Sequence, residues 1–329
     1  MHIFNNQIKF LTTIYLLIFI LVYSFHTGNK IGSKESIFDN YFNKNRYLNK
    51  KFAIIRRKCR FCGLFSLYIV SLGCINKYLL EGYIPIIDIK SFPNSINGLI
   101  SSKKNYFEMF FEQPFGYTLE LVIKNAKNII YIDCKDCSPR PDLKSMLLNE
   151  PKKYFWHNFS NRYMPIKIEL INLSNKIKNK LFKNSKNILG VLTRGTDYIA
   201  KKPRGHPIPP KITDLIKDVR EFDKKYSYDY IFFSTEDDAI RKKFSDNFKI
   251  KVRQIEQKFK MNYDYKKRSY LNFNRNIIGN VEFNKIYLLN IIILSQCLDI
   301  VAARCSGTAG IFVLTNGFRN IKIYDIGVY

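Results

Sequence analysis

Acidic residues are scarce in this sequence. Its 329 residues include 27 Asp and Glu but 54 Lys and Arg, which gives a formal net charge of +27 at pH 7. Such a field favours polyanionic partners: nucleic acid, an anionic membrane face or phosphorylated substrates. The basic residues are spread over the whole chain together with Asn and Ile, and they form no single basic cluster with interleaved aromatic residues. We therefore expect no dedicated nucleic-acid interface.

Clear metal and dinucleotide signatures are also missing. The seven cysteines include two CxxC pairs, at 59–62 and 134–137. These pairs lie much farther apart than the roughly 15–20 residues typical of a four-thiolate zinc site. We therefore expect isolated buried thiols in a reducing compartment, and neither a metal nor another cofactor. No GxGxxG follows the first predicted strand, so no dinucleotide site is expected there.

The amino-terminal block at 10–25 contains no charged residue. It is slightly shorter than the ~20 residues that span a bilayer, so it fits a signal peptide, a membrane anchor or a buried helix. No A-x-A cleavage site follows, which favours the anchor. Lys and Arg are more frequent after the block than before it, which places the body on the cytoplasmic side, beside anionic lipid. A type II anchor with a lumenal body, in a eukaryotic secretory setting, stays open.

The remaining chain alternates apolar strands with helical stretches, and its 46% hydrophobic residues can support real cores. This alternation predicts an α/β fold. We divide the chain into a hydrophobic segment, a polar linker and two domains, at 1–30, 31–50, 51–182 and 183–329. Strands are expected at 52–55, 83–89, 129–133, 188–192, 228–233 and 300–303. Helices are expected at 64–82, 163–182, 212–224, 239–244 and 287–298, with another from residue 311 and a Pro- and Lys-rich connector at 139–153.

Polar loops follow three of the strands in the second domain. Arg194 and Gly195 follow the first, an acidic cluster at 235–238 follows the second, and small residues at 305–310 follow the third. Open parallel sheets bind ligands at the carboxyl ends of their strands. An Arg fork suits phosphate, and backbone N–H groups before a helix form a phosphate cradle. The plainer alternatives are a surface Arg–Asp pair for the first loop and helix capping for the acidic cluster.

The first domain contains an unusually aromatic stretch at 105–117. It either packs in the core or lines an acceptor pocket with Glu112 and Gln113 in its wall, and we favour the core.

Several of these stretches, in this order, resemble peptide motifs of the fucosyltransferase superfamily, which includes the α1,6-, α1,2- and protein O-fucosyltransferases and the rhizobial nodulation fucosyltransferase. GVLTRGTDY is similar to the family's HxRRxD strand motif, FFSTEDD to its acidic motif, and DIVAARCSGTAG to its third, phosphate-side motif. In the amino half, CGLFS, GYIPIIDIK and FEQPFGY are also similar, and the residues expected on the acceptor side are Gly63, Glu112 and Gln113. The resemblance covers about residues 50–329.

The resemblance implies a GT-B-like fold, with two Rossmann-like domains facing a cleft. It also implies an inverting transfer of fucose from GDP-fucose to a glycan acceptor, without a required metal. Carried over, Arg194 stabilises the diphosphate leaving group, and Asp197 fixes its loop. The second motif would contact the base or ribose of the donor, and the third its phosphates; the residues concerned are Thr235, Glu236, Asp237, Ser306, Gly307 and Thr308.

The sequence departs from the family at two positions of the first motif. Leu192 stands where the family has His, and Gly195 stands where it has a second Arg. We expect Arg204 to supply the missing positive charge, and His206 to contact phosphate or take the acceptor proton, unless His206 is a structural loop residue. Another nucleotide sugar as donor stays open. So does a non-enzymatic, basic membrane-surface protein that binds acidic lipids or polyanionic glycans.

Overall fold

The computed structural model describes residues 46–57, 62–91, 96, 104–134, 137–256, 263–264, 269–270 and 277–329. The apolar block at 10–25 lies outside these residues. Within them, no helix has both the length and the apolar character needed to cross a membrane. Of the described residues, those at 46–50 and 124–128 fall in one unit and all the others in a second, compact unit. The second unit contains both large sheets.

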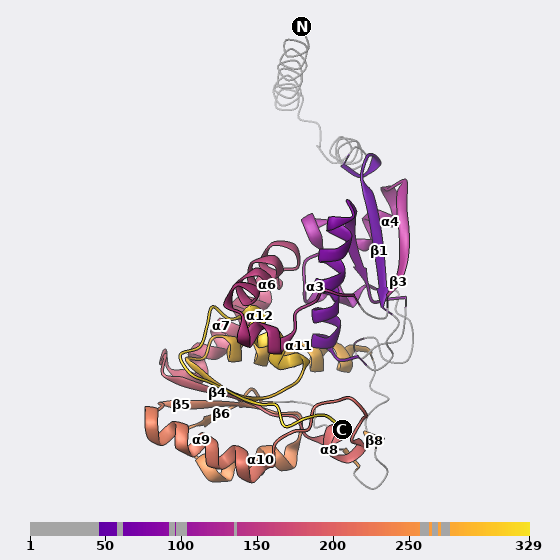
Figure 1. The fold of residues 1–329 in the computed structure, drawn as a ribbon. Helices are drawn as coiled ribbons and strands as arrows, with labels where there is room; N and C mark the ends of the chain where they lie inside the picture. The colour runs from indigo at the N-terminus through magenta and orange to yellow at the C-terminus, as the bar shows by residue number, and fades with distance from the viewer. Residues whose placement is uncertain are drawn as a thin grey trace, which may run out of the picture. The chain divides into compact units, whose positions relative to one another are not determined.

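The first sheet has three strands in the order β2-β1-β3 (Figure 1): β1 (Lys51–Arg57), β2 (Ile84–Asp88) and β3 (Asn128–Cys134). β1 and β2 are parallel, with Phe52 opposite Ile84. Helix α3 (Leu64–Leu80) connects them and buries most of its apolar side chains. The chain then turns at Gly82, whose φ of +79° favours glycine. The predicted β-loop-α-β unit is therefore confirmed.

The aromatic stretch after β2 belongs to the core. It forms two short 3₁₀ turns, η2 (Tyr106–Met109) and η3 (Pro114–Gly116), and leads into α4 (Leu119–Asn125). The most deeply buried side chains of the stretch are Phe107, Phe110 and Phe111. This burial agrees with the core interpretation of the aromatic residues.

The prediction of a connector at 139–153 is wrong, because helices occupy most of that segment. They are α5 (Leu143–Leu148) and α6 (Glu150–Tyr163), and α7 (Ile168–Phe182) follows. The Asp142 and Asn149 side chains each accept a backbone hydrogen bond at 2.9 Å and so cap the first two. Pro151 lies in the first turn of α6, where its missing N–H has no cost. The helix expected from residue 163 begins later, after Pro165.

The second sheet has five parallel strands in the order β10-β9-β4-β5-β6. They are β4 (Ile188–Leu192), β5 (Tyr230–Ser234), β6 (Val252–Arg253), β9 (Asp299–Ala303) and β10 (Ile321–Tyr324). Every residue of β4 and β9 is buried, in agreement with their continuous apolar runs. The strand order reverses between β4 and β9, and open sheets of this kind bind ligands at that switch point.

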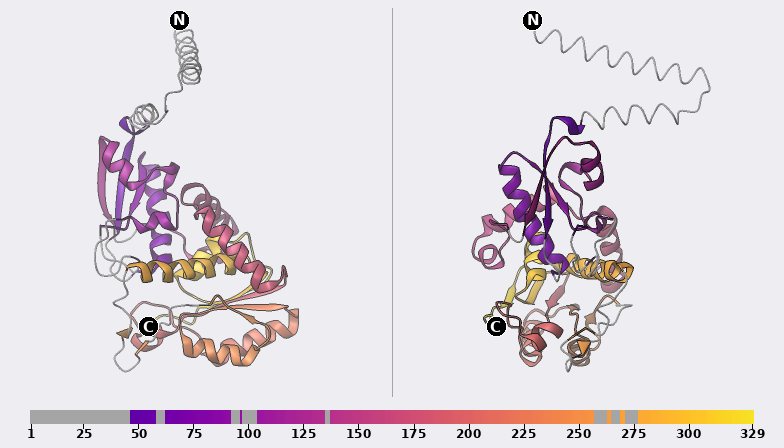
Figure 2. Two further views of the ribbon diagram at one scale, coloured as in Figure 1. Left: turned by 180° about the vertical axis from the view of Figure 1, so that it is seen from behind. Right: turned by 90° about the vertical axis from the view of Figure 1, so that its right-hand side faces the viewer.

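Helices cover both faces of the second sheet (Figures 1 and 2). On one face lie α9 (Ile212–Tyr226) and α10 (Asp238–Phe248), and on the other α7, α11 (Ile277–Ser295) and α12 (Ser306–Leu314). α12 begins five positions before the expected residue 311, because Ser306, Gly307 and Thr308 form its first turn. A two-stranded antiparallel ribbon, β7 (Tyr263–Asp264) with β8 (Ser269–Tyr270), completes the described strands.

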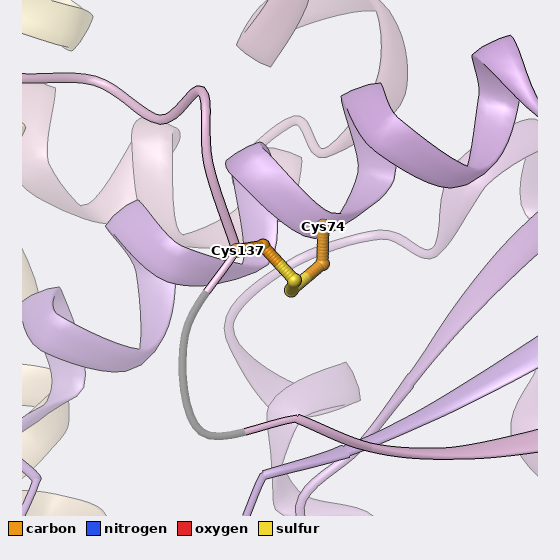
Figure 3. Close-up of a disulfide and its surroundings, with 2 residues drawn as sticks. All are labelled: Cys74 and Cys137. Carbon is orange, nitrogen blue, oxygen red and sulfur yellow. A yellow bond between two sulfur atoms is a disulfide. The ribbon is translucent and has the colours of Figure 1, made fainter.

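A disulfide joins Cys74 in α3 to Cys137 in the loop after β3 (Figure 3). Cys62 is also disulfide-bonded, whereas Cys297 and Cys305 are buried free thiols. The expectation of isolated thiols is therefore wrong for part of the set. Gly73 allows the close approach, because a Cβ there would lie 2.7 Å from the Cβ of Arg140. Cys74 belongs to neither CxxC pair, so sequence spacing gave no sign of this pairing.

Candidate functional site

The candidate site lies at the carboxyl ends of β4 and β9, on either side of the switch point. Arg194 follows β4 by two residues, and α12 begins three residues after β9. The backbone of Thr193 donates to the carbonyl of Ser234 at 3.2 Å, which extends the pairing of β4 and β5 toward the site. The loops after β4, β5 and β9 therefore start from the same end of the parallel strands, as the sequence predicted.

Arg194 is held from two sides. Its Nε lies 3.3 Å from Oε1 of Glu236, and its guanidinium carbon lies 4.7 Å from the centre of the Tyr198 ring. The same Glu236 oxygen accepts the backbone N–H of Gly195 at 3.0 Å. The Arg194 side chain is 23% exposed and that of Glu236 only 10%. Glu236 thus joins the loops after β4 and β5 and fixes the direction of the Arg194 fork.

Gly195 has no space for a side chain. A Cβ at this position would lie 2.5 Å from the Cβ of Asp237 and 2.8 Å from Cδ1 of Ile240. Asp237 is buried, and one of its carboxylate oxygens accepts the backbone N–H groups of Ala239 and Ile240, each at 3.0 Å. This packing requires glycine at position 195.

The remaining polar groups of the loop after β5 hold the loop itself. Thr235 is buried, and its hydroxyl accepts the backbone N–H of Asp237 at 3.2 Å. Arg241 donates to the Thr235 carbonyl and to the Asp238 carboxylate, both at 2.8 Å. The helix-capping interpretation of the acidic cluster therefore describes Asp237, whereas Glu236 is the residue that reaches Arg194.

The first turn of α12 is capped by a thiol. Sγ of Cys305 accepts the backbone N–H of Thr308 at 3.5 Å, and the fully buried Thr308 hydroxyl donates to the Ala303 carbonyl. Ser306 is the exposed hydroxyl of this turn. The first backbone N–H groups of α12 and the Ser306 hydroxyl therefore lie at the carboxyl ends of the strands, as Arg194 does.

Tyr287 in α11 belongs to this site, although sequence reasoning did not identify it. A Cβ on Gly307 would lie 2.2 Å from its hydroxyl oxygen. Burial raises the pKa of Tyr287 well above its ordinary value; Cys305 and Glu236 add to the rise, and Arg194 opposes it. The hydroxyl therefore stays protonated and can donate. The only sequence signal for Tyr287 is that a tyrosine, with its polar hydroxyl, occurs within an apolar helical run.

The loop that carries Arg204 and His206 approaches the same cluster through Tyr198. Nδ1 of His206 lies 3.3 Å from the Tyr198 hydroxyl, and the two rings meet edge to face. The carboxyl-terminal segment holds this loop, because Tyr329 exchanges backbone hydrogen bonds at 3.0 Å with Gly205 and His206. Arg204 is exposed.

Asp197 lies in α8 (Thr196–Lys201) directly after Gly195 and Thr196. Its side chain is outside the described part of the structure.

Of the three residues expected on the acceptor side, only Gly63 is linked to this cluster. It precedes α3, where the Phe65 ring meets the Tyr287 ring edge to face at 5.4 Å. Glu112 pairs with Lys167 at 2.6 Å. The structure does not bring Glu112 to Arg194.

Gln113 is buried and uses its amide within the first sheet. It accepts from the N–H of Ile87 at 2.9 Å and donates to the Ile87 carbonyl at 2.7 Å. A second donation, at 3.1 Å, goes to the carboxylate of Glu108. Gln113 thus extends the hydrogen bonding of β2 at the side of that strand.

Among the residues that the structure describes, no three His, Cys, Asp or Glu side chains come together as a metal site would require. The positive charge at the candidate site comes from Arg194 and from the amino end of α12.

Comparison with solved structures shows which fold this is. The chain matches the α1,6-fucosyltransferase NodZ soaked with GDP-fucose, with a TM-score of 0.50 and 13% identity over 81% of this chain and 93% of that chain. NodZ from Bradyrhizobium matches with a TM-score of 0.51, also at 13% identity, over 81% and 94% of the two chains. The same enzyme has been co-crystallised with GDP, and that structure matches with a TM-score of 0.50.

No protein-family model and no curated protein sequence matches the chain. The predicted resemblance to fucosyltransferases is confirmed at the level of the fold, a mixed α/β fold with parallel sheets.

Proposed function

We propose that the protein is an inverting glycosyltransferase that transfers fucose from GDP-fucose to a glycan acceptor. The observation that carries the proposal is the position of Arg194, which Glu236 holds beside the switch point between β4 and β9. The fold likeness to a fucosyltransferase solved with GDP and with GDP-fucose supports the choice of donor. The domain at 183–329 binds the donor, the domain at 51–182 binds the acceptor, and the two face a cleft as in GT-B enzymes.

In this mechanism the diphosphate is the leaving group, and negative charge develops on its β-phosphate as the sugar departs. Arg194 neutralises that charge with a guanidinium fork whose direction is already fixed, so little reorganisation is needed in the transition state. Backbone N–H groups and the Ser306 hydroxyl at the start of α12 bind the other phosphate oxygens. Tyr287 adds a neutral donor beside them, and His206 takes the acceptor proton or contacts phosphate.

Donor selectivity tests the proposal directly. We expect GDP to raise the thermal unfolding temperature more than UDP, ADP or dTDP does, because ligands that bind the native state stabilise it. Product analysis against a panel of nucleotide sugars then identifies the sugar. A shift with a different nucleotide would support a transferase of the same architecture with another donor. Gly195 motivates this panel, since the loop has no room for the family's second Arg.

The net charge of +27 motivates a second candidate function, binding of acidic lipids or polyanionic glycans without catalysis. Strong, salt-sensitive binding to anionic liposomes, together with no thermal shift for any nucleotide, would favour this candidate and contradict the transferase.

We further propose that residues 10–25 anchor the protein in a membrane and that its body faces an oxidising compartment. The support is the disulfide between Cys74 and Cys137, since such bonds persist in the secretory lumen and are rare in the cytosol. This favours the lumenal alternative over the cytoplasmic side that the positive-inside rule indicates. Protease protection of the body in intact microsomes is the expected result, and digestion without detergent would contradict it.

A further inference from the structure

A cavity of about 580 Å³ lies apart from the candidate transfer site. It is surrounded by the end of α6, the start of α7 and the carboxyl ends of α11 and α12. Its volume falls within the roughly 300–1,000 Å³ usual for small-ligand sites. Its wall consists of Tyr68, Asn161, Met164, Pro165, Ile166, Ile171, Ile292, Ser295, Gln296, Cys297, Leu314, Thr315, Asn316 and Gly317.

The cavity lies at the amino ends of the strands of the second sheet, whereas Arg194 lies at their carboxyl ends. Gln296 and Cys297 come just before β9, and Gly317 precedes β10, so these wall residues lie at the amino ends of the strands. Leu298 donates its backbone N–H to the carbonyl of Ile188, the first residue of β4, at 3.0 Å. A five-residue strand spans roughly 15 Å, which separates this cavity from the carboxyl-end site.

The wall is uncharged, although the chain carries 81 charged side chains among its Lys, Arg, Asp and Glu (54 + 27). Its polar side chains are amides and hydroxyls, and the rest of the wall is largely aliphatic. The wall has three amide side chains, and all three belong to exposed residues: Asn161, Gln296 and Asn316. Amides both donate and accept, so this wall suits a ligand with many neutral hydroxyl groups and an apolar face.

Tyr68 is the aromatic residue of the wall. Its side chain is fully buried, and the Ser160 side chain is the hydrogen-bonding group beside its hydroxyl. Burial raises the pKa of Tyr68, an effect that Ser160 partly offsets, so the hydroxyl stays neutral.

We propose that this cavity is a binding site for a neutral carbohydrate of one or two sugar units, separate from the transfer site. None of the wall residues is charged, so the wall itself offers no ion pair to a phosphorylated or acidic ligand. The amides supply directional hydrogen bonds, and Ile166, Ile292 and Leu314 supply the apolar surface on which a sugar ring packs. Such a site would hold a part of a glycan that does not react.

The test uses the whole protein and measures binding by saturation-transfer NMR and calorimetry. The probes are N-acetylglucosamine, galactose, mannose and their disaccharides, with glucuronic acid as the charged counterpart. We expect saturable binding of at least one neutral probe, binding unchanged by excess GDP, and at least tenfold weaker binding in the Asn161→Ala, Gln296→Ala, Asn316→Ala triple variant. Asn179→Ala, an exposed amide on α7 that does not line the cavity, is the matched control and should bind as the wild type.

Three results would overturn the proposal: no binding of any neutral probe, equal binding by the triple variant, or competition by GDP. The last would place the sugar at the transfer site. This test is independent of the nucleotide panel that tests the proposed function. A protein that bound no nucleotide could still bind a neutral sugar in this cavity, and the triple alanine variant would still bind that sugar more weakly.

Discussion

Arg194 and Glu236 form the contact on which the proposed chemistry depends. We predict that Arg194→Lys lowers kcat/KM by about 100-fold or more, because an ammonium group cannot reproduce the bidentate hydrogen bonds of a guanidinium fork to phosphate. The variant should remain folded, since Arg194 is partly exposed and lies over the Tyr198 ring, where the Lys stem can also pack. The measurements are steady-state transfer from the donor that the panel identifies and the thermal shift with GDP.

The matched control is Arg220→Lys, an exposed Arg of α9 that donates to Asn247. It should transfer sugar at the wild-type rate. Wild-type turnover by Arg194→Lys would contradict the role assigned to this residue.

Gly195 is a packing requirement of the same loop. We predict that Gly195→Ala lowers the free energy of unfolding by about 2 kcal/mol, because its methyl group would overlap the buried Asp237 side chain. Gly63→Ala is the comparison: nothing lies within 4 Å of a Cβ there and its φ is −70°, so a loss below about 1 kcal/mol is expected. Denaturant unfolding measures both, and equal stabilities would show that the loop adapts to a side chain.

At the scale of elements, α12 packs on α3 through a glycine. A Cβ at Gly310 would lie 2.1 Å from Cδ1 of Phe65. Alanine normally stabilises a helix interior relative to glycine. Here we predict the opposite: Gly310→Ala lowers the free energy of unfolding of the protein by about 2 kcal/mol. In the double variant with Phe65→Leu, the smaller side chain should accept the methyl group. The double variant should therefore lose about 1 kcal/mol less free energy of unfolding than the sum of the losses in the two single variants.

This double-mutant cycle, measured by urea unfolding, separates local overlap from general helix damage. Additive losses would mean that the ring of Phe65 does not limit the approach of the two helices. A Gly310→Ala variant more stable than wild type would mean that the ring simply moves aside.

The elements that could be predicted from sequence are those with one dominant physical signal. β4 and β9 are continuous apolar runs, and both are completely buried. α5 and α6 were missed because their Pro and Lys content resembles a connector, whereas their stability comes from two capping side chains. The start of α12 was placed too late because Ser306 and Gly307 favour loops, and the Cys305 cap does not show in the spacing.

The candidate site divides in the same way. Arg194 and Glu236 could be predicted because each follows a recognisable strand. Tyr287 could not, since its approach to Gly307 depends on how α11 packs against α12, which no local pattern records. The disulfide was missed for a related reason, because it needs the close contact that Gly73 permits.

At the scale of the whole molecule, the buried Asp299 links stability to pH. Its carboxylate accepts from Arg319 at 2.6 Å, from the Asn320 backbone at 2.8 Å and from the Tyr228 hydroxyl. Burial alone would raise the pKa of Asp299, but the hydrogen bonds from Arg319, Tyr228 and Asn320 outweigh it and hold the pKa below its ordinary value.

Because the pKa of Asp299 is lower in the folded state, its stabilising effect is complete above the unfolded pKa of about 4 and is lost as the pH falls through the folded pKa. We predict that Asp299→Asn is less stable than wild type by about 2–3 kcal/mol at pH 7 and that this gap narrows below about pH 4. Urea unfolding across this pH range measures the gap. Asp246→Asn, an exposed residue of α10, should match wild type throughout, and a gap for Asp299→Asn that does not change with pH would contradict the linkage.

The strand order of the second sheet also determines when its centre can form. β4 is a central strand, and one of its two partners is β9, which is synthesised only after α8, α9, α10 and α11. Until β9 leaves the ribosome, the buried strand Ile188–Leu192 has one open edge and an apolar surface. Pairing between such distant segments is slow. The nascent chain must therefore keep this strand from aggregating while the sheet is incomplete, which makes it a natural client for chaperones during synthesis.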